Sequence, residues 1–135
     1  LYLRHRLRYA VLLLAAMGGI TLLVETAKTL VQSSRPLNGI VPETGYSFPS
    51  GHVTSTMVFL GLLTYFAWQR WKNPRTRALI ILLYMGIESI VGFSRVYLNV
   101  HWLSDILGGY ILGTFWLTFT VFLYQYSENK WPDKT

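Results

Sequence analysis

The sequence predicts an all-α fold: an integral membrane helical bundle with four spans, forming one domain over residues 1–135. Hydrophobic residues make up 52% of the chain and charged residues only 13%, whereas a soluble domain carries about 25% charged residues. Four long apolar segments are separated by short polar stretches. The formal net charge of +6 could indicate nucleic-acid binding, but the basic residues lie at the ends of the apolar segments. No nucleic-acid partner is therefore expected.

The first apolar segment, residues 9–24, is uncharged and is expected to continue as a helix to about Val31. It has no small-residue cleavage pattern and leads into Glu25 and Lys28, so we interpret it as a retained helix rather than a signal peptide. The other segments are residues 53–68, 78–93 and 106–126. A membrane span needs about 20 residues. The last segment reaches that length alone, and the others reach it once their polar ends are included.

The basic residues predict how the bundle is oriented in the membrane. Nine of the twelve lie at one end, before the first segment, between the second and third, and after the fourth: Arg4, Arg6, Arg8, Arg70, Lys72, Arg75, Arg77, Lys130 and Lys134. The positive-inside rule makes this end cytoplasmic. Lys28, Arg35 and Arg95 fall on the two opposite connections, where basic residues are disfavoured unless they have a function. We therefore expect a multi-pass protein of the cell membrane with its site on the extracytoplasmic side.

Two of the polar stretches on that side precede the second span. Lys28 and Arg35 are seven positions apart and share a helix face if the first helix runs that far, although Pro36 disfavours helix at Arg35. Two interfacial cations that snorkel toward water are the alternative interpretation.

The second stretch, Pro49-Ser50-Gly51-His52, stands where a helix N-terminus offers free N–H groups to an anion. Gly51 allows close backbone approach, and Ser50 can cap the helix and donate to a ligand oxygen. An ordinary capped turn explains Ser50 and Gly51 but not His52.

The third stretch holds an arginine, a histidine and an aspartate at fixed offsets. Arg95 precedes His101 by six positions, and Asp105 follows His101 by four. If a helix begins around His101, the two side chains lie on one face, and the carboxylate can fix the imidazole tautomer and leave one nitrogen as a nucleophile. The planar guanidinium of Arg95 suits phosphate oxygens. A histidine near a helix start is often only a satisfied polar residue, so this stretch alone leaves both interpretations open.

Three further features concern the spans themselves. Glu88 lies within the otherwise apolar third segment, and such a residue usually faces the bundle interior and has a partner. Gly109 and Gly113 have a small-xxx-small spacing that permits close helix contact. Glu25, three positions before Lys28, is placed to pair with it.

Gathered on one membrane face, these residues describe a site for phosphoryl transfer, which needs positioning and charge neutralisation. Of the two histidines, one would attack phosphorus and the other protonate the leaving oxygen. The residue chemistry alone does not decide between them, although the spacing of Asp105 favours His101. The chain has no cysteine, and the carboxylates near this face, Glu25, Glu43 and Asp105, form no cluster suited to two metal ions. Neither a metal nor a cofactor is expected.

The patterns K-x6-RP, PSGH and SR-x5-H-x3-D, in this order, resemble the three signature motifs of the type 2 phosphatidic acid phosphatase superfamily. The resemblance implies that His101 is the nucleophile and forms a phosphohistidine, that Asp105 orients it, and that His52 is the general acid. It also implies five phosphate-binding residues: Lys28, Arg35, Ser50, Gly51 and Arg95. The implied activity is hydrolysis of a membrane lipid phosphate, such as phosphatidylglycerophosphate, phosphatidic acid or undecaprenyl diphosphate, at the outer membrane face.

Integral membrane members of that superfamily usually have six spans. Two N-terminal helices are therefore expected to be missing from this sequence, unless the chain is a short form. The expected partners are the lipid phosphate substrate and the surrounding membrane lipids, with no oligomeric state predicted. The alternatives are a phosphotransferase on the same scaffold and a non-catalytic membrane scaffold or transporter subunit. A vanadate-dependent haloperoxidase shares these motifs, but it is expected to be soluble.

Overall fold

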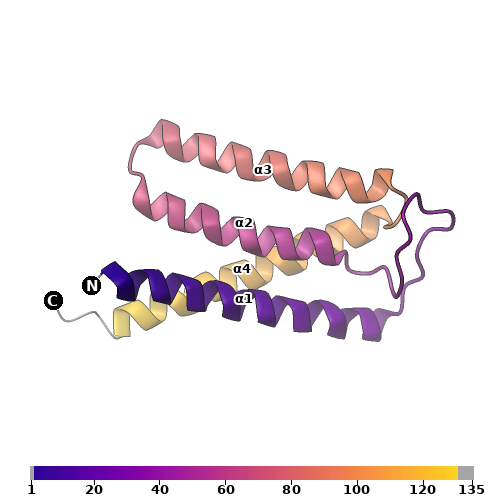
Figure 1. Cartoon of the computed structure of the whole chain (residues 1–135), viewed down its shortest axis with the longest axis horizontal. Helices are drawn as coiled ribbons and strands as arrows, with labels where there is room; N and C mark the ends of the chain where they lie inside the picture. The colour runs from indigo at the N-terminus through magenta and orange to yellow at the C-terminus, as the bar shows by residue number, and fades with distance from the viewer. Residues whose placement is uncertain (1, 131–135) are drawn as a thin grey trace.

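The computed structural model describes residues 2–130, and side chains from residue 7 onward, as four α-helices joined by three loops (Figure 1). The helices are α1 (Tyr2–Val31), α2 (Gly51–Arg70), α3 (Pro74–Tyr97) and α4 (Leu103–Lys130). They run alternately up and down as a bundle, and α2 packs against each of the other three. The predicted all-α fold is confirmed. Residues 131–135, which include Lys134, lie outside the described part, as do the side chains of Arg4 and Arg6.

Three of the helices are long and apolar enough to cross a membrane: Leu7–Val31, Pro74–Tyr97 and Leu103–Lys130. α2 has 20 residues but carries polar side chains in its first turns, so its place as the fourth span follows from its position in the bundle. Many large apolar side chains point outward, among them Leu14, Ile111 and Phe115. An apolar exterior around a partly polar interior is the arrangement expected of a protein dissolved in lipid.

Local sequence signals explain where the helices begin and end. α1 ends at Val31, as predicted, because Gln32 adopts a left-handed conformation with φ of 52°. Pro36 lies beyond this end and is not the terminator. α3 begins at Pro74, and the first position of a helix is the one that tolerates proline best. The side chain of Asn73 caps this helix by accepting a hydrogen bond from the N–H of Arg75.

Close packing between α2 and α4 relies on glycine. A Cβ atom built on Gly109 would lie 3.1 Å from Oγ1 of Thr54, and one on Gly113 would lie 2.8 Å from Cβ of Met57. Both glycines are buried. The helix contact predicted from their spacing is therefore confirmed.

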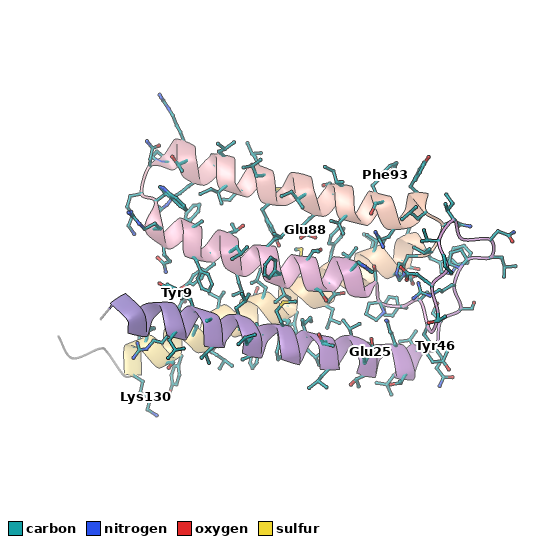
Figure 2. All side chains as sticks on the ribbon, viewed as in Figure 1. Tyr9, Glu25, Tyr46, Glu88, Phe93 and Lys130 are labelled. Atoms are coloured by element: carbon teal, nitrogen blue, oxygen red, sulfur yellow. The ribbon has the colours of Figure 1, made fainter. Side chains whose placement is uncertain are left out.

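Glu88 is buried between α2, α3 and α4, whereas Phe93 points away from the bundle (Figure 2). Oε2 of Glu88 lies 3.2 Å from Oγ1 of Thr56 on α2. The backbone carbonyl of Glu88 accepts a 2.6 Å hydrogen bond from the hydroxyl of Tyr110 on α4. The prediction that Glu88 faces the interior and has a partner is confirmed. Its carboxylate and backbone link α3 to the two neighbouring helices.

The α1–α2 loop and the α3–α4 loop lie at the same end of the bundle, opposite the termini and the α2–α3 loop (Figure 1). Several hydrogen bonds join these two loops, among them three that are 2.8 to 2.9 Å long. Asn99 Nδ2 donates to the carbonyl of Leu37 at 2.8 Å. The N–H of Ile40 donates to the carbonyl of Leu98 at 2.9 Å. Nε1 of Trp102 donates to the carbonyl of Ser34 at 2.9 Å. The α1–α2 and α3–α4 loops are thereby held together.

Candidate active site

A cavity of about 600 Å³ opens at the end of the bundle where the two loops meet. Its lining includes five residues of the predicted site: Lys28, Arg35, Gly51, His52 and His101. They come from the end of α1, the α1–α2 loop, the start of α2 and the α3–α4 loop. Both histidines therefore border one space. The other three predicted residues, Ser50, Arg95 and Asp105, are not among the lining residues.

Asp105 and Arg35 hold the two ring nitrogens of His101. Nδ1 lies 3.2 Å from Oδ2 of Asp105, and because a carboxylate only accepts hydrogen bonds, Nδ1 carries the proton. Nε2 lies 3.4 Å from Nη1 of Arg35, which only donates, so Nε2 presents its lone pair. Both neighbours thus favour the same neutral tautomer, with the unprotonated nitrogen beside a cation that lines the cavity.

The start of α4 positions Asp105. The helix begins at Leu103, so His101 precedes it rather than opening it as predicted. Asp105 is the third residue of α4, and its Oδ2 also accepts a 2.8 Å hydrogen bond from the N–H of Trp102. An acidic side chain at this position satisfies a free N–H and interacts well with the helix dipole. The helix therefore orients the carboxylate, and the carboxylate orients the imidazole.

The environment of His101 favours its uncharged form. Burial lowers the pKa of His101 from its ordinary value of 6.5, and the positive charge of Arg35 acts in the same direction. The hydrogen bond to Asp105 and the charges of Asp105 and Glu43 act in the opposite direction. Because burial dominates, the imidazole stays neutral to a lower pH than a free histidine does.

Arg35 reaches the cavity from the loop, because α1 ends at Val31. Lys28 and Arg35 would share a helix face only if α1 ran as far as Arg35, and it does not. The guanidinium of Arg35 donates to the carbonyls of Gly45 at 3.1 Å, Thr44 at 3.2 Å and Val100 at 2.9 Å. These backbone contacts fix the side chain between the two loops.

Lys28 lies in the last turn of α1 and pairs with Glu25 at 3.2 Å, as its spacing predicted. A Cβ atom built on Gly51 would lie 3.9 Å from Nζ of Lys28, so the ammonium group stands over the first residue of α2. The free N–H groups at the start of a helix point out of its N-terminal end and favour an anion there. Lys28 and the start of α2 thus form one positive wall of the cavity.

Ser50 occupies the position before α2, but its side chain does not cap the helix, contrary to the prediction. Its hydroxyl is fully buried and finds no hydrogen-bond partner within residues 7–130. Its N–H donates to the carbonyl of Asp105 at 3.0 Å. This bond holds the start of α2 against the start of α4.

Glu43 is a site residue that the motifs did not identify. Its Oε2 lies 2.9 Å from Nη1 of Arg35, and its Oε1 lies 3.6 Å from Nη1 of Arg95. Oε2 is also 4.0 Å from Nε2 of His101. Arg95 is thus connected to the cavity by its contact with Glu43, which belongs to the lining. The signal available in the sequence was an acidic residue on an outer loop between two cationic motifs.

Comparison with known proteins identifies the family. The model of the PAP2 superfamily matches residues 9–130. The chain belongs to the PAP2 superfamily. The matched region contains all three motifs, so the family resemblance inferred from Lys28 to Asp105 is confirmed.

Several named proteins are similar to this PAP2 chain. Phosphatidylglycerophosphatase B of Bacillus subtilis is 33% identical over 104 residues, covering 76% of this chain and 51% of that protein. The undecaprenyl-diphosphatase of Sulfolobus acidocaldarius is 33% identical over 119 residues, covering 75% and 52%. The chain thus spans about half the length of these curated relatives.

A crystal structure supports the same fold assignment. It is that of a transmembrane PAP2-type phosphatidylglycerolphosphate phosphatase from Bacillus subtilis, with a TM-score of 0.78 and 29% sequence identity. The alignment covers 85% of this chain and 58% of that one. Together with the three apolar helices, this likeness shows that the chain is an integral membrane protein.

Proposed function

We propose that this chain carries the active site of a lipid phosphatase of the cell membrane, which hydrolyses a lipid phosphate at the outer face through a phosphohistidine on His101. The observation that carries the proposal is the cavity shared by His52 and His101, with Lys28 and Arg35 in its lining. Two imidazoles beside fixed cations suit attack on a phosphate ester better than any other common reaction.

The reaction proceeds in two displacements at phosphorus. In the first, Nε2 of His101 attacks, the bond from phosphorus to the lipid oxygen breaks, and His52 gives that oxygen a proton. In the second, His52 takes a proton from water, which attacks the phosphohistidine and releases inorganic phosphate and free His101. Asp105 stabilises the positive imidazole ring in the intermediate. No step requires a metal.

The groups around the cavity neutralise the charge that spreads over the phosphoryl oxygens in the transition state. They are the side chains of Lys28, Arg35 and Arg95, the hydroxyl of Ser50 and the backbone N–H of Gly51. Spontaneous hydrolysis of phosphate monoesters is among the slowest biological reactions, with enzymatic accelerations up to ~10²¹-fold. So large an acceleration accounts for the density of cations at this site.

The substrate is a lipid whose phosphate enters the cavity while its tails stay in the bilayer. Candidates are phosphatidylglycerophosphate, phosphatidic acid and undecaprenyl diphosphate. Relatives of this chain are named for the first and the last of these, and a further relative is a lipid A 4′-phosphatase of Porphyromonas gingivalis. The position of the cavity at one end of an apolar bundle supports a headgroup of this kind.

Release of inorganic phosphate from these three lipids, with EDTA present, tests the proposal. We expect the chain to be active with the chelator, and His101→Ala to lose about 10³-fold or more. His5→Ala is the matched control, because His5 lies in the first turns of α1 at the opposite end of the bundle, and it should retain activity. Activity that EDTA abolishes and magnesium restores would contradict the metal-independent mechanism.

Two other outcomes would favour the alternatives. Phosphate transfer that occurs only with an added lipid or sugar acceptor would indicate a phosphotransferase. A His101→Ala variant that retains its function would indicate a non-catalytic membrane scaffold or transporter subunit.

A further inference from the structure

Glu43 occupies the space between two of the cations proposed to hold the substrate phosphate. Its two carboxylate oxygens divide between the guanidinium groups of Arg35 and Arg95, at 2.9 and 3.6 Å. The side chain is only 22% exposed, and Oε2 is 4.0 Å from Nε2 of His101. A phosphorus atom attacked by Nε2 must come within about 3–3.5 Å of it. The phosphate and the Glu43 carboxylate therefore require the same place.

We propose that Glu43 is an internal competitor of the substrate phosphate. In the resting protein its carboxylate neutralises Arg35 and Arg95, and an incoming phosphate displaces it. This inference rests on the proposed function and adds a means by which the chain controls access to that same site. It assigns to the α1–α2 loop a role in setting the affinity for phosphate.

The displacement is a side-chain movement, because the backbone near Glu43 is held on both sides. The carbonyls of Thr44 and Gly45 accept hydrogen bonds from Arg35. The N–H of Ile40 donates to the carbonyl of Leu98. A glutamate has three rotatable side-chain bonds, so its carboxylate can leave the arginines without opening of the loop.

The exchange leaves no guanidinium group unpaired. Removing one partner of a largely buried ion pair is strongly unfavourable, because the remaining charge is left in a poorly solvated place. A phosphate dianion brings more charge and more acceptor oxygens than a carboxylate, and it binds arginine through strong charge-assisted hydrogen bonds. The arginines thus keep an anionic partner in both states, and Glu43 prevents weaker anions from occupying the site.

The fraction of molecules in which Glu43 has left Arg35 and Arg95 determines how much Glu43 weakens phosphate binding. When only a fraction of molecules can bind, the apparent dissociation constant is the intrinsic one divided by that fraction. If Glu43 leaves the arginines in about one molecule in ten, phosphate binds about tenfold more weakly than it would without this competitor.

Binding of inorganic phosphate to the purified chain in detergent tests the proposal directly. Isothermal titration calorimetry should show that Glu43→Gln, which keeps the shape but not the charge, lowers the dissociation constant about five- to tenfold. The inhibition constant of inorganic phosphate in the lipid phosphatase assay should fall by a similar factor. Unchanged or weaker phosphate binding by Glu43→Gln would overturn the proposal and indicate that Glu43 only positions the arginines.

Glu128→Gln is the matched control. Glu128 forms an ion pair of 2.7 Å with Arg8 at the opposite end of the bundle, so its neutralisation should leave phosphate affinity unchanged. If Glu43→Gln does not fold, Glu43→Asp serves, because its carboxylate is one methylene shorter and should tighten phosphate binding by a smaller factor. Calorimetry needs no turnover. A chain that binds phosphate without hydrolysing lipids would contradict the proposed function. The calorimetry would still show whether Glu43 competes with phosphate.

Discussion

His101 owes its chemical character to the residues at its two ring nitrogens. Asp105 accepts the Nδ1 proton, and Arg35 lies against Nε2, so the lone pair is available beside the cavity. Burial lowers the pKa of His101 below 6.5. Under the proposed function, kcat/KM should therefore stay high below pH 6.5 and fall only when the pH drops through this lowered pKa and the nucleophile becomes protonated.

Asp105→Asn is expected to reduce kcat/KM about 10²–10⁴-fold, because an amide no longer selects the required tautomer. The acidic limb of the pH profile should also move to lower pH, since the hydrogen bond and the charge of Asp105 both raise the pKa of His101. The fold should persist, because the amide oxygen can still accept from the N–H of Trp102.

Phosphate release measured across the pH range with the wild-type and variant proteins checks this expectation. The ionisation of the lipid phosphate is the same in both measurements, so a difference between the two acidic limbs reports on the protein. A limb that moves to higher pH, or a rate close to that of the wild type, would contradict the assigned pairing.

The residues of the site were predictable to different degrees. The contact between His101 and Asp105 follows from a four-residue spacing next to a helix start, which is local information. Arg35 and Glu43 meet only because the loop of residues 32–50 folds back over the end of the bundle. No periodicity describes such a path, so the Glu43 contact could not be predicted from spacing.

At the scale of the helices, the starts of α2 and α4 are held together by close packing. Gly109 lies where a Cβ atom would be 3.1 Å from Oγ1 of Thr54 and 3.2 Å from the carbonyl oxygen of Ser50. The same region contains the bond from the Ser50 N–H to the Asp105 carbonyl. The separation of these two helices therefore sets the distance between the PSGH motif and the His101–Asp105 pair.

Gly109→Leu should push α4 away from α2 and lower the stability by about 1–3 kcal/mol, the usual cost of overpacking. Phosphate release should fall more than tenfold, because the same shift separates His52 from His101. Gly86→Leu is the matched control, since nothing lies within 4 Å of a Cβ built on Gly86 in α3. Thermal unfolding in detergent and phosphate assays measure both effects. Equal behaviour of the two variants would contradict the packing argument.

The helices themselves follow from composition, but most of their ends do not, the end of α1 at Val31 being the exception. Apolar segments predicted four helices, and each observed helix is longer than its segment because polar residues such as Arg70 and Lys130 continue the last turns. Conversely, the last helix was expected to begin around His101, whereas α4 begins at Leu103. Hydrophobicity marks the part of a helix in lipid, whereas capping and loop contacts determine where it stops.

At the scale of the molecule, the polar residues of the cavity lie at one end of the bundle, and the described basic residues that predict its orientation lie at the other end. The cavity and its cations lie at the end formed by the α1–α2 and α3–α4 loops, near Glu25 and Tyr46 (Figure 2). The α2–α3 loop and Lys130 lie at the other end. Because four helices alternate in direction, the two loops of the site share a membrane face whichever way the bundle is inserted. The excess of basic residues at the opposite end predicts that this face is extracytoplasmic.

Labelling of introduced cysteines tests that orientation without a background, because the chain contains no cysteine. Tyr46→Cys places a thiol on the exposed loop beside the cavity, and Lys72→Cys places one on the α2–α3 loop. The Lys72→Cys change leaves the basic residues of the neighbouring helix ends, Arg70, Arg75 and Arg77, in place. A membrane-impermeant maleimide added to intact cells should label Tyr46→Cys, and it should label Lys72→Cys only after permeabilisation. The reverse pattern would place the cavity on the cytoplasmic side. The substrate would then have to present its phosphate to the inner leaflet, although the chemistry at His101 would be unaltered.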